Sequence, residues 1–214
     1  MNKTHTTTQI VAKEGWKSIG VAFVLFVLSL IFGVIPWVFL TLLAALIFLH
    51  RNPERIPEED DRLVIIAPAD GMVRSIEKGK TPAGEACLRV VIENSLLDVG
   101  VLRAPCALVI SHAHPRHGLF LPQPSPKAPL LNEQILLTCK RENETVYMRV
   151  MAGVFTQSIR LFAEKPTVKL GERLGYIHEG AVELLLPLHV RIRVTLGQSL
   201  KAGETVLGYF KSEQ

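Results

Sequence analysis

The stretch "GYIHEGAVELLLP" (residues 175–187) places a polar turn directly before an uninterrupted apolar run. His178, Glu179 and Gly180 are turn residues, and residues 181–186 are typical of a β-strand rich in aliphatic side chains. A glycine at the entrance of a strand serves either backbone geometry or chemistry that needs an exposed peptide bond. The rest of the chain has to decide between these two roles.

Similar short runs follow one another after residue 62 and predict a mainly β domain. They are rich in Val, Ile and Leu and are separated by turn residues. The runs are "LVIIAP" (63–68), "LRVVIE" (88–93), "ALVIS" (107–111), "VYMRVM" (146–151), "SIRLF" (158–162), "VELLLP" (182–187) and "HVRIRV" (189–194). The proline-rich segment 113–134 predicts a long loop, and long ordered loops often carry function.

An uncharged apolar run at residues 19–49 predicts a membrane anchor. It exceeds both the about 20 residues of a spanning helix and the about 7–15 residues of a signal-peptide core. Gly33 and Pro36 lie in its middle and favour a break, hence a hairpin of two short helices. A single long tilted helix is the alternative.

The charges around this run predict its orientation. Basic residues flank both ends: Lys13 and Lys17 before it, and His50, Arg51 and Arg55 after it. Because positive charge marks the cytoplasmic side, both ends are expected in the cytoplasm, at the inner membrane of the cell. The predicted organisation is an anchoring hairpin at residues 1–50, a polar linker at 51–62 and a β domain at 63–214.

Composition excludes some classes of function. The net charge of +4 and the absence of an Arg/Lys run with interleaved aromatic residues argue against nucleic acid as a partner. A mildly positive chain suits an anionic membrane surface. Cys87, Cys106 and Cys139 form no CxxC pair, so we expect free thiols in a reducing compartment and no metal site.

Two local clusters carry titratable side chains. His112, His114 and His117 lie beside Arg116 without a neighbouring carboxylate, which favours a solvated loop over a metal site. A second hypothesis is that these four residues contact a lipid head group, with arginine as the forked phosphate donor. Asp70 in "APADGMV" is either an Asp-Gly turn that closes a hairpin or a carboxylate that orients a base.

Five motifs in order resemble one family. They are "FLHRNPERIPEEDDRLVIIAPADGMV" (48–73), "NSLLDVGVLRAP" (94–105), "LLNEQILLT" (130–138), "MAGVFTQSIRLF" (151–162) and "GERLGYIHEGAVELLLP" (171–187). Together they resemble the short, membrane-associated form of phosphatidylserine decarboxylase, over nearly the whole chain from Lys13 to Phe210. The resemblance implies a β domain of hybrid-barrel or sandwich-like form behind the hydrophobic hairpin, and "GQSLKAGETVLGYF" (197–210) resembles its closing hairpin.

The resemblance also implies a chemistry. The family is made as a proenzyme in which a Gly-Ser bond cleaves itself and leaves a pyruvoyl group, the electron sink for decarboxylation of the lipid. The serine is the nucleophile, activated by a His and an Asp. Asp70 matches the family Asp, Asn132 and Glu133 match its Asn-Glu pair, and Arg103 begins the match to the end of its central motif.

This chain departs from the family at two places. Gly100 stands where the family has its His. The cleavage motif is one residue shorter, so that counting forward puts Ala181 at the serine and counting back from Pro187 puts Gly180 there. Neither alignment leaves a hydroxyl or a thiol, so no pyruvoyl cofactor is expected to form.

The sequence therefore predicts a membrane-anchored, decarboxylase-like protein without self-processing, which binds phospholipid such as phosphatidylserine, a second copy or an intact paralogue. The alternatives are an active decarboxylase that makes phosphatidylethanolamine, or an engineered serine mutant of one. An engineered change accounts for Ala181 but not for Gly100 or the shortened spacing. Without a catalytic role, Asp70 is expected to tolerate substitution by Asn.

Overall fold

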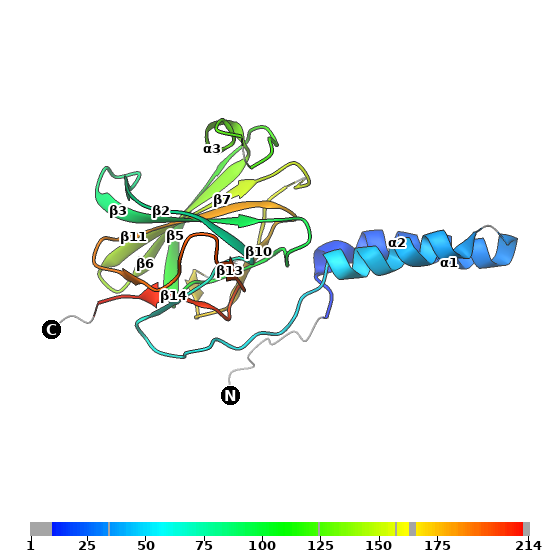
Figure 1. The fold of residues 1–214 in the computed structure, drawn as a ribbon, viewed down its shortest axis with the longest axis horizontal. Helices are drawn as coiled ribbons and strands as arrows, with labels where there is room; N and C mark the ends of the chain where they lie inside the picture. The colour runs from blue at the N-terminus through cyan, green and yellow to red at the C-terminus, as the bar shows by residue number, and fades with distance from the viewer. Residues whose placement is uncertain (1–9, 34, 124, 157, 163–165, 212–214) are drawn as a thin grey trace. The chain divides into compact units, whose positions relative to one another are not determined.

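The computed structural model describes residues 10–33, 35–123, 125–156, 158–162 and 166–211. Its contacts divide the chain into two compact units, Met1–Glu54 and Arg55–Gln214. Figure 1 shows that the first unit is helical and that the second is built mainly of strands. The predicted fold class, a mainly β domain with an N-terminal hydrophobic helical hairpin, is confirmed.

The first unit contains two apolar helices. A 3-10 turn, η1 (Lys13–Gly15), leads into α1 (Trp16–Phe32), and α2 (Pro36–Leu49) follows. Gly33 ends α1 in the left-handed conformation with φ 69°, which glycine adopts at little cost. Pro36 begins α2, where its missing N–H leaves no bond unmade. The break was predicted from these two residues, and the single long helix is wrong.

The segment Lys13–Phe32 is long and apolar enough to cross a membrane, and 17% of its most apolar 18-residue stretch is buried. The second helix has 14 residues. The flanks of the two helices pair with each other, because Ala12 N donates to His50 O over 2.8 Å and Asn52 N donates to Ile10 O over 2.8 Å. Both ends of the hairpin therefore emerge together.

Short antiparallel strands make up the second unit. Within the described residues they form an eight-stranded curled sheet, β13-β2-β3-β11-β7-β6-β5-β9, and two three-stranded sheets, β1-β14-β12 and β4-β10-β8. The elements are β1 (Val64–Ile66), β2 (Gly71–Lys80), β3 (Ala86–Asn94), β4 (Val101–Arg103), β5 (Leu108–Arg116), α3 (Ala128–Leu131), β6 (Gln134–Arg141), β7 (Glu144–Ala152), β8 (Arg160–Leu161), β9 (Thr167–Val168), β10 (Arg173–Tyr176), β11 (Gly180–Pro187), β12 (Arg191–Ile192), β13 (Ser199–Leu200) and β14 (Val206–Tyr209).

Strand β11 is the centre of the large sheet, between β3 and β7. Val182, Leu184 and Leu186 point into the main core. On the other face Leu185 packs in a second cluster with Cys87 and Tyr147. Both faces are covered, and this explains why the run has no regular polar alternation.

Every predicted run contains a strand, but the boundaries needed correction. The predicted loop 113–134 is wrong at its start, because residues 113–116 continue β5 and pair with β6. Residues 128–131 within it form the short helix α3. The run 189–194 contributes a strand of two residues. The sequence patterns did not reveal β2, β4, β6, β9 or β10. In β2 and β6 polar residues interrupt the apolar ones, and β4, β9 and β10 have four residues or fewer.

Candidate functional site

Three positions singled out in the sequence meet at one end of the large sheet. Strand β2 begins directly after Asp70. Gly180, the first residue of β11, pairs with Asn94, the last residue of β3. The Asn94 side-chain amide donates to Asp70 O over 2.9 Å and to Val99 O over 3.3 Å, and Val99 precedes Gly100. The buried Asn94 thus joins the three positions at which the resemblance places the Asp, the His and the Ser.

Asp70 is buried and ion-paired. Its carboxylate forms a two-pronged pair with the Arg55 guanidinium, in which Nη2 donates to Oδ2 over 2.7 Å and Nη1 bonds Oδ1. Ala202 N donates to Oδ1 over 2.8 Å. Both oxygens are therefore occupied by structural partners. The expectation that Asn would replace Asp70 without effect is revised, because an amide cannot form this ion pair.

The hairpin-turn interpretation of Asp70 is also wrong. Strand β1, before Asp70, pairs with β14, whereas β2, after it, pairs with β3 and β13. The Asp-Gly pair therefore connects two different sheets. Gly71, with φ 139°, is needed because an added Cβ would overlap Glu93 O of the neighbouring strand.

Gly100 lies where no larger side chain fits. A Cβ there would overlap the Ile177 carbonyl oxygen and lie 2.9 Å from Cζ of Tyr176. Ile177 N donates to Gly100 O over 2.9 Å and holds the two segments at this separation. The Tyr176 ring, 2% exposed, packs edge-to-face against His178 with 5.1 Å between ring centroids. A side chain at residue 100, where the resemblance places a His, would therefore meet both the Ile177 oxygen and the Tyr176 ring.

The turn before β11 is fastened to the loop after β7. Glu179 O accepts from Gly153 N over 3.0 Å and from the Thr156 hydroxyl. The same hydroxyl accepts from Glu179 N over 3.0 Å. The Glu179 carboxylate accepts from Phe155 N over 3.0 Å. These bonds surround the peptide positions at which the family breaks its chain.

Among the described residues at this turn, no hydroxyl or thiol is free to act as a nucleophile. Ala181 is 2% exposed and carries only a methyl group. The Thr156 hydroxyl both donates to and accepts from the backbone of Glu179. The three thiols are free and buried. Burial raises the pKa of Cys106 and of Cys139 to about 12, so these thiols stay protonated and unreactive at neutral pH.

The histidine cluster lies on β5 and directly beyond it, three strands from β11 in the large sheet. His112 and His114 are exposed and stacked, with 5.8 Å between ring centroids. His117 Nδ1 lies 3.6 Å from the Glu133 carboxylate. Among the described residues, no group of three His, Cys, Asp or Glu side chains is placed to hold a metal ion.

Arg116, the fourth member of the cluster, faces the end of α3. Its Nη2 donates to Leu130 O over 2.7 Å. The contact binds the 117–131 segment back to β5. The guanidinium thus has a structural role at this position, and a forked phosphate contact would have to compete with it.

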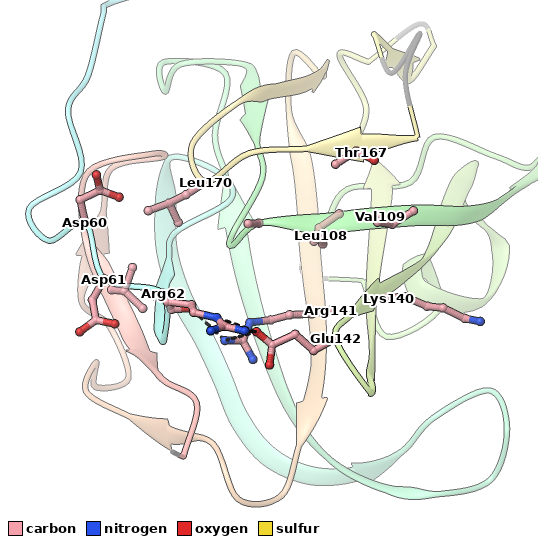
Figure 2. A pocket seen from close by; sticks show the side chains of 12 residues that line it. Asp60, Asp61, Arg62, Leu108, Val109, Lys140, Arg141, Glu142, Thr167 and Leu170 are labelled. Atoms are coloured by element: carbon pink, nitrogen blue, oxygen red, sulfur yellow. Dashed lines mark hydrogen bonds and ion pairs between the residues drawn. The ribbon is translucent and has the colours of Figure 1, made fainter. Parts of the chain in front are cut away.

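A surface pocket of about 510 Å³ lies at the opposite end of the sheet, around the turn between β6 and β7 (Figure 2). Two arginines there are bonded: Arg62 Nε donates to the Glu142 carboxylate over 2.8 Å, and Arg141 Nη2 donates to the backbone oxygen of Arg62 over 2.9 Å. Arg141 also stacks over the Phe210 ring at 4.0 Å. The pocket is separate from the Gly180 turn, and its lining holds three acidic and three basic side chains.

Comparison with known proteins identifies the relatives of this chain. The family model described as phosphatidylserine decarboxylase matches residues 42–208. The phosphatidylserine decarboxylase proenzyme of Anaplasma phagocytophilum (strain HZ) is 35% identical, over 94% of this chain and 92% of the relative. The proenzymes of Ruegeria pomeroyi and Ehrlichia ruminantium (strain Gardel) are 34% and 32% identical, over 91% and 93% of this chain and 92% and 90% of the relative.

Proposed function

The chain belongs to the phosphatidylserine decarboxylase family, and we propose that it is a membrane-anchored member that does not process itself. In this proposal it is a non-catalytic protein of phospholipid metabolism that binds lipid or a protein partner. The observation that carries the proposal is the Gly180–Ala181 turn, where the family's self-cleavage needs a nucleophile and this chain has a methyl group.

The chemistry of cleavage explains why this loss matters. An oxygen or sulfur atom must attack the preceding carbonyl carbon, and strain in the turn lowers a barrier without supplying an attacking atom. The residues present therefore do not fit a pyruvoyl group. Gly100 supports the same conclusion, since the space of a proton-accepting imidazole is taken by Tyr176 and the Ile177 carbonyl.

The hairpin supports anchoring at a membrane with the β domain in the cytoplasm, at the inner membrane. Both flanks carry basic residues, and the backbone pairing of Ala12 with His50 keeps the two ends together. A hairpin enters and leaves the membrane on the same side. Both basic ends can therefore lie in the cytoplasm, as the positive-inside rule requires. Cysteine labelling at positions 13 and 55 of the chain in intact cells should give equal accessibility. Labelling from opposite sides would require a single span.

The proposed binding function is supported by the ordered sheet end around the Gly180–Ala181 turn. The sheet end that surrounds the degenerate turn is ordered by Asn94, Asp70 and Thr156 although it lacks the reactive groups. A phospholipid such as phosphatidylserine, a second copy of the chain, or an intact family member is the partner that we propose for it.

Intact-mass spectrometry of the purified protein tests the proposal. We expect one uncut chain of 23.7 kDa and no carbonyl that reacts with hydroxylamine. Incubation with phosphatidylserine should yield no phosphatidylethanolamine. A C-terminal fragment that begins at residue 180 or 181, or phosphatidylethanolamine formed in proportion to protein, would instead support the alternative of an active decarboxylase, which the names of the relatives favour.

A further inference from the structure

Two histidines of the second unit stand side by side on one face of a strand. The sequence-based preference for a solvated loop over a metal site assumed that these residues belong to a loop. Instead, His112 and His114 lie within β5 and pair with β6. Side chains two residues apart on a strand point to the same face. The two imidazoles are accordingly stacked, with 5.8 Å between ring centroids, and both are exposed to solvent.

A β-bulge turns both rings away from the core. The register between β5 and β6 shifts between Ile110 and His112. Ile110 opposes Cys139 and packs against the main core, whereas His112 opposes Thr138, which points to the other face of β6. Without the extra residue, the period of two along a strand would place both histidines on the face of Ile110. The bulge therefore presents the two imidazoles together on the outer face of the sheet.

The backbone that carries the pair is restricted before any ligand arrives. Pro115 follows His114, and a residue before proline is confined to extended conformations. Ala113 and Pro115, on either side of His114, pair with Leu137 and Ile135 of β6. A ligand that binds both imidazoles therefore orders side chains alone, which lowers the entropic cost of binding.

The separation of the two rings suits a single metal ion. Neutral imidazole is the commonest metal ligand among side chains, and it binds through one ring nitrogen. With Zn–N bonds of about 2.0–2.1 Å, two imidazoles on one tetrahedral ion have their ring centres about 5 Å apart. The observed separation of 5.8 Å is slightly larger. Small rotations of two exposed side chains within their rotamers close this difference.

The strands beside the pair add no uncompensated charge opposite it. The β6 residues that oppose the two histidines are Thr138 and Leu136, both uncharged. On β7, Arg149 opposes Leu136. The Arg149 guanidinium lies 2.7 Å from the Glu183 carboxylate of β11, which compensates its charge.

The basic side chains Arg116 and Lys140 lie further along the two strands. Arg116 follows His114 by two residues, but its Nη2 donates to Leu130 O over 2.7 Å, toward α3. Lys140 is exposed, so water and salt screen its charge. A cation at this face would be held by the lone pairs of neutral imidazoles and not by negative charge. Such ligands favour late transition metals over Mg²⁺ and Ca²⁺, which prefer oxygen.

We propose that His112 and His114 form a chelating site for one divalent late transition-metal ion, of the class of Zn²⁺ and Cu²⁺. Two ring nitrogens hold the ion, and water fills its remaining positions. The site needs no third protein ligand, and no group of three metal-binding side chains is found within the described part of the chain. It is independent of self-processing, of lipid binding and of how the two units are placed.

Zinc binding by the full chain, purified in detergent micelles without a histidine tag, tests the proposal. Zn²⁺ is titrated in competition with a chromophoric chelator, and Cu²⁺ and Mg²⁺ are compared in the same assay. We expect one site per chain that binds Cu²⁺ more tightly than Zn²⁺ and does not bind Mg²⁺. His112→Ala and His114→Ala should each weaken Zn²⁺ binding at least about tenfold, since loss of even a supporting group around a metal ligand costs that much.

A register swap is the matched control. The double variant Ala113→His/His114→Ala keeps two histidines but places the second on the opposite face of β5, so it should bind Zn²⁺ as weakly as His114→Ala. His117→Ala, beyond the end of β5 and beside Glu133, should bind Zn²⁺ as the parent does. All exchanged side chains are exposed, and equal unfolding midpoints without metal confirm that the variants are folded.

Several results would overturn the proposed site. One is the absence of saturable Zn²⁺ binding by the parent. Another is parent-like affinity of the register swap or of either single alanine variant at positions 112 and 114. A loss in His117→Ala as large as in His114→Ala would also contradict a site made by the two strand histidines.

Discussion

Asp70 and the turn at residues 178–181 lie at the same end of the same sheet, yet they are held by different forces. Asp70 matches its family and forms an ion pair with Arg55 and a bond from Ala202 N. The turn is held by hydrogen bonds between Glu179 and the loop after β7, from the Thr156 hydroxyl and from two backbone N–H groups. The Asp70 side chain thus carries structure itself, whereas at the turn, where we propose that the family serine is lost, Ala181 contributes only a methyl group.

The largest effect is expected at Asp70. Asp70→Asn removes one partner of a buried ion pair and leaves the Arg55 guanidinium, whose side chain is 11% exposed, with only the Glu204 carboxylate as counter-charge, 4.0 Å from Nε. The free energy of unfolding should fall by about 3–5 kcal/mol. Chemical denaturation measures it, and the double variant with Arg55→Met should recover part of the loss. A loss below about 1 kcal/mol, the level of an exposed pair, would mean that Asp70 has no structural role.

Gly100→His tests whether the site can be rebuilt. The new side chain would overlap the Ile177 carbonyl and crowd Tyr176, so the free energy of unfolding should fall by about 2–3 kcal/mol. Adding Tyr176→Ala should recover little, because the backbone oxygen remains in the way. Unchanged thermal stability of Gly100→His would show that the segment moves aside and that a histidine fits after all.

Thr156→Val tests the bonds of the turn itself. The hydroxyl is replaced by a methyl group of similar size. The Glu179 backbone oxygen loses the hydroxyl as a donor, and the Glu179 N–H loses it as an acceptor. We expect the free energy of unfolding to fall by about 1–3 kcal/mol, measured by thermal or denaturant unfolding. Thr156→Ser keeps the hydroxyl and should behave like the parent more closely than Val does. Equal stability of all three proteins would contradict a bracing role for this residue.

Ala181→Ser should have the smallest effect. The serine restores a hydroxyl, but the shortened spacing and Gly100 remain, so the intact mass should stay that of an uncut chain and no ketone should form. The parent serves as the control in the same mass spectrum. Cleavage of Ala181→Ser, with a carbonyl that reacts with hydroxylamine, would identify the parent as a serine mutant of a working decarboxylase.

The amino-acid sequence determined those features whose cause is local. Gly33 and Pro36 end one helix and begin the next because backbone conformation and the missing proline N–H act at the residue itself. Apolar runs predicted the central strand β11, since both of its faces are buried. That Ala181 carries only a methyl group is a matter of covalent chemistry, and no fold can change it.

Only the tertiary structure decided which distant residues share the site. Arg55 of the linker pairs with Asp70. Tyr176 lies beside Gly100. The Thr156 hydroxyl, which follows the end of β7, accepts from Glu179 N. Nothing in the local pattern of "MAGVFTQ" predicts the last of these contacts. They arise because strands that are far apart in sequence pair side by side, and the free energy of a buried ion pair or hydrogen bond depends on the partner that this pairing brings within about 3 Å.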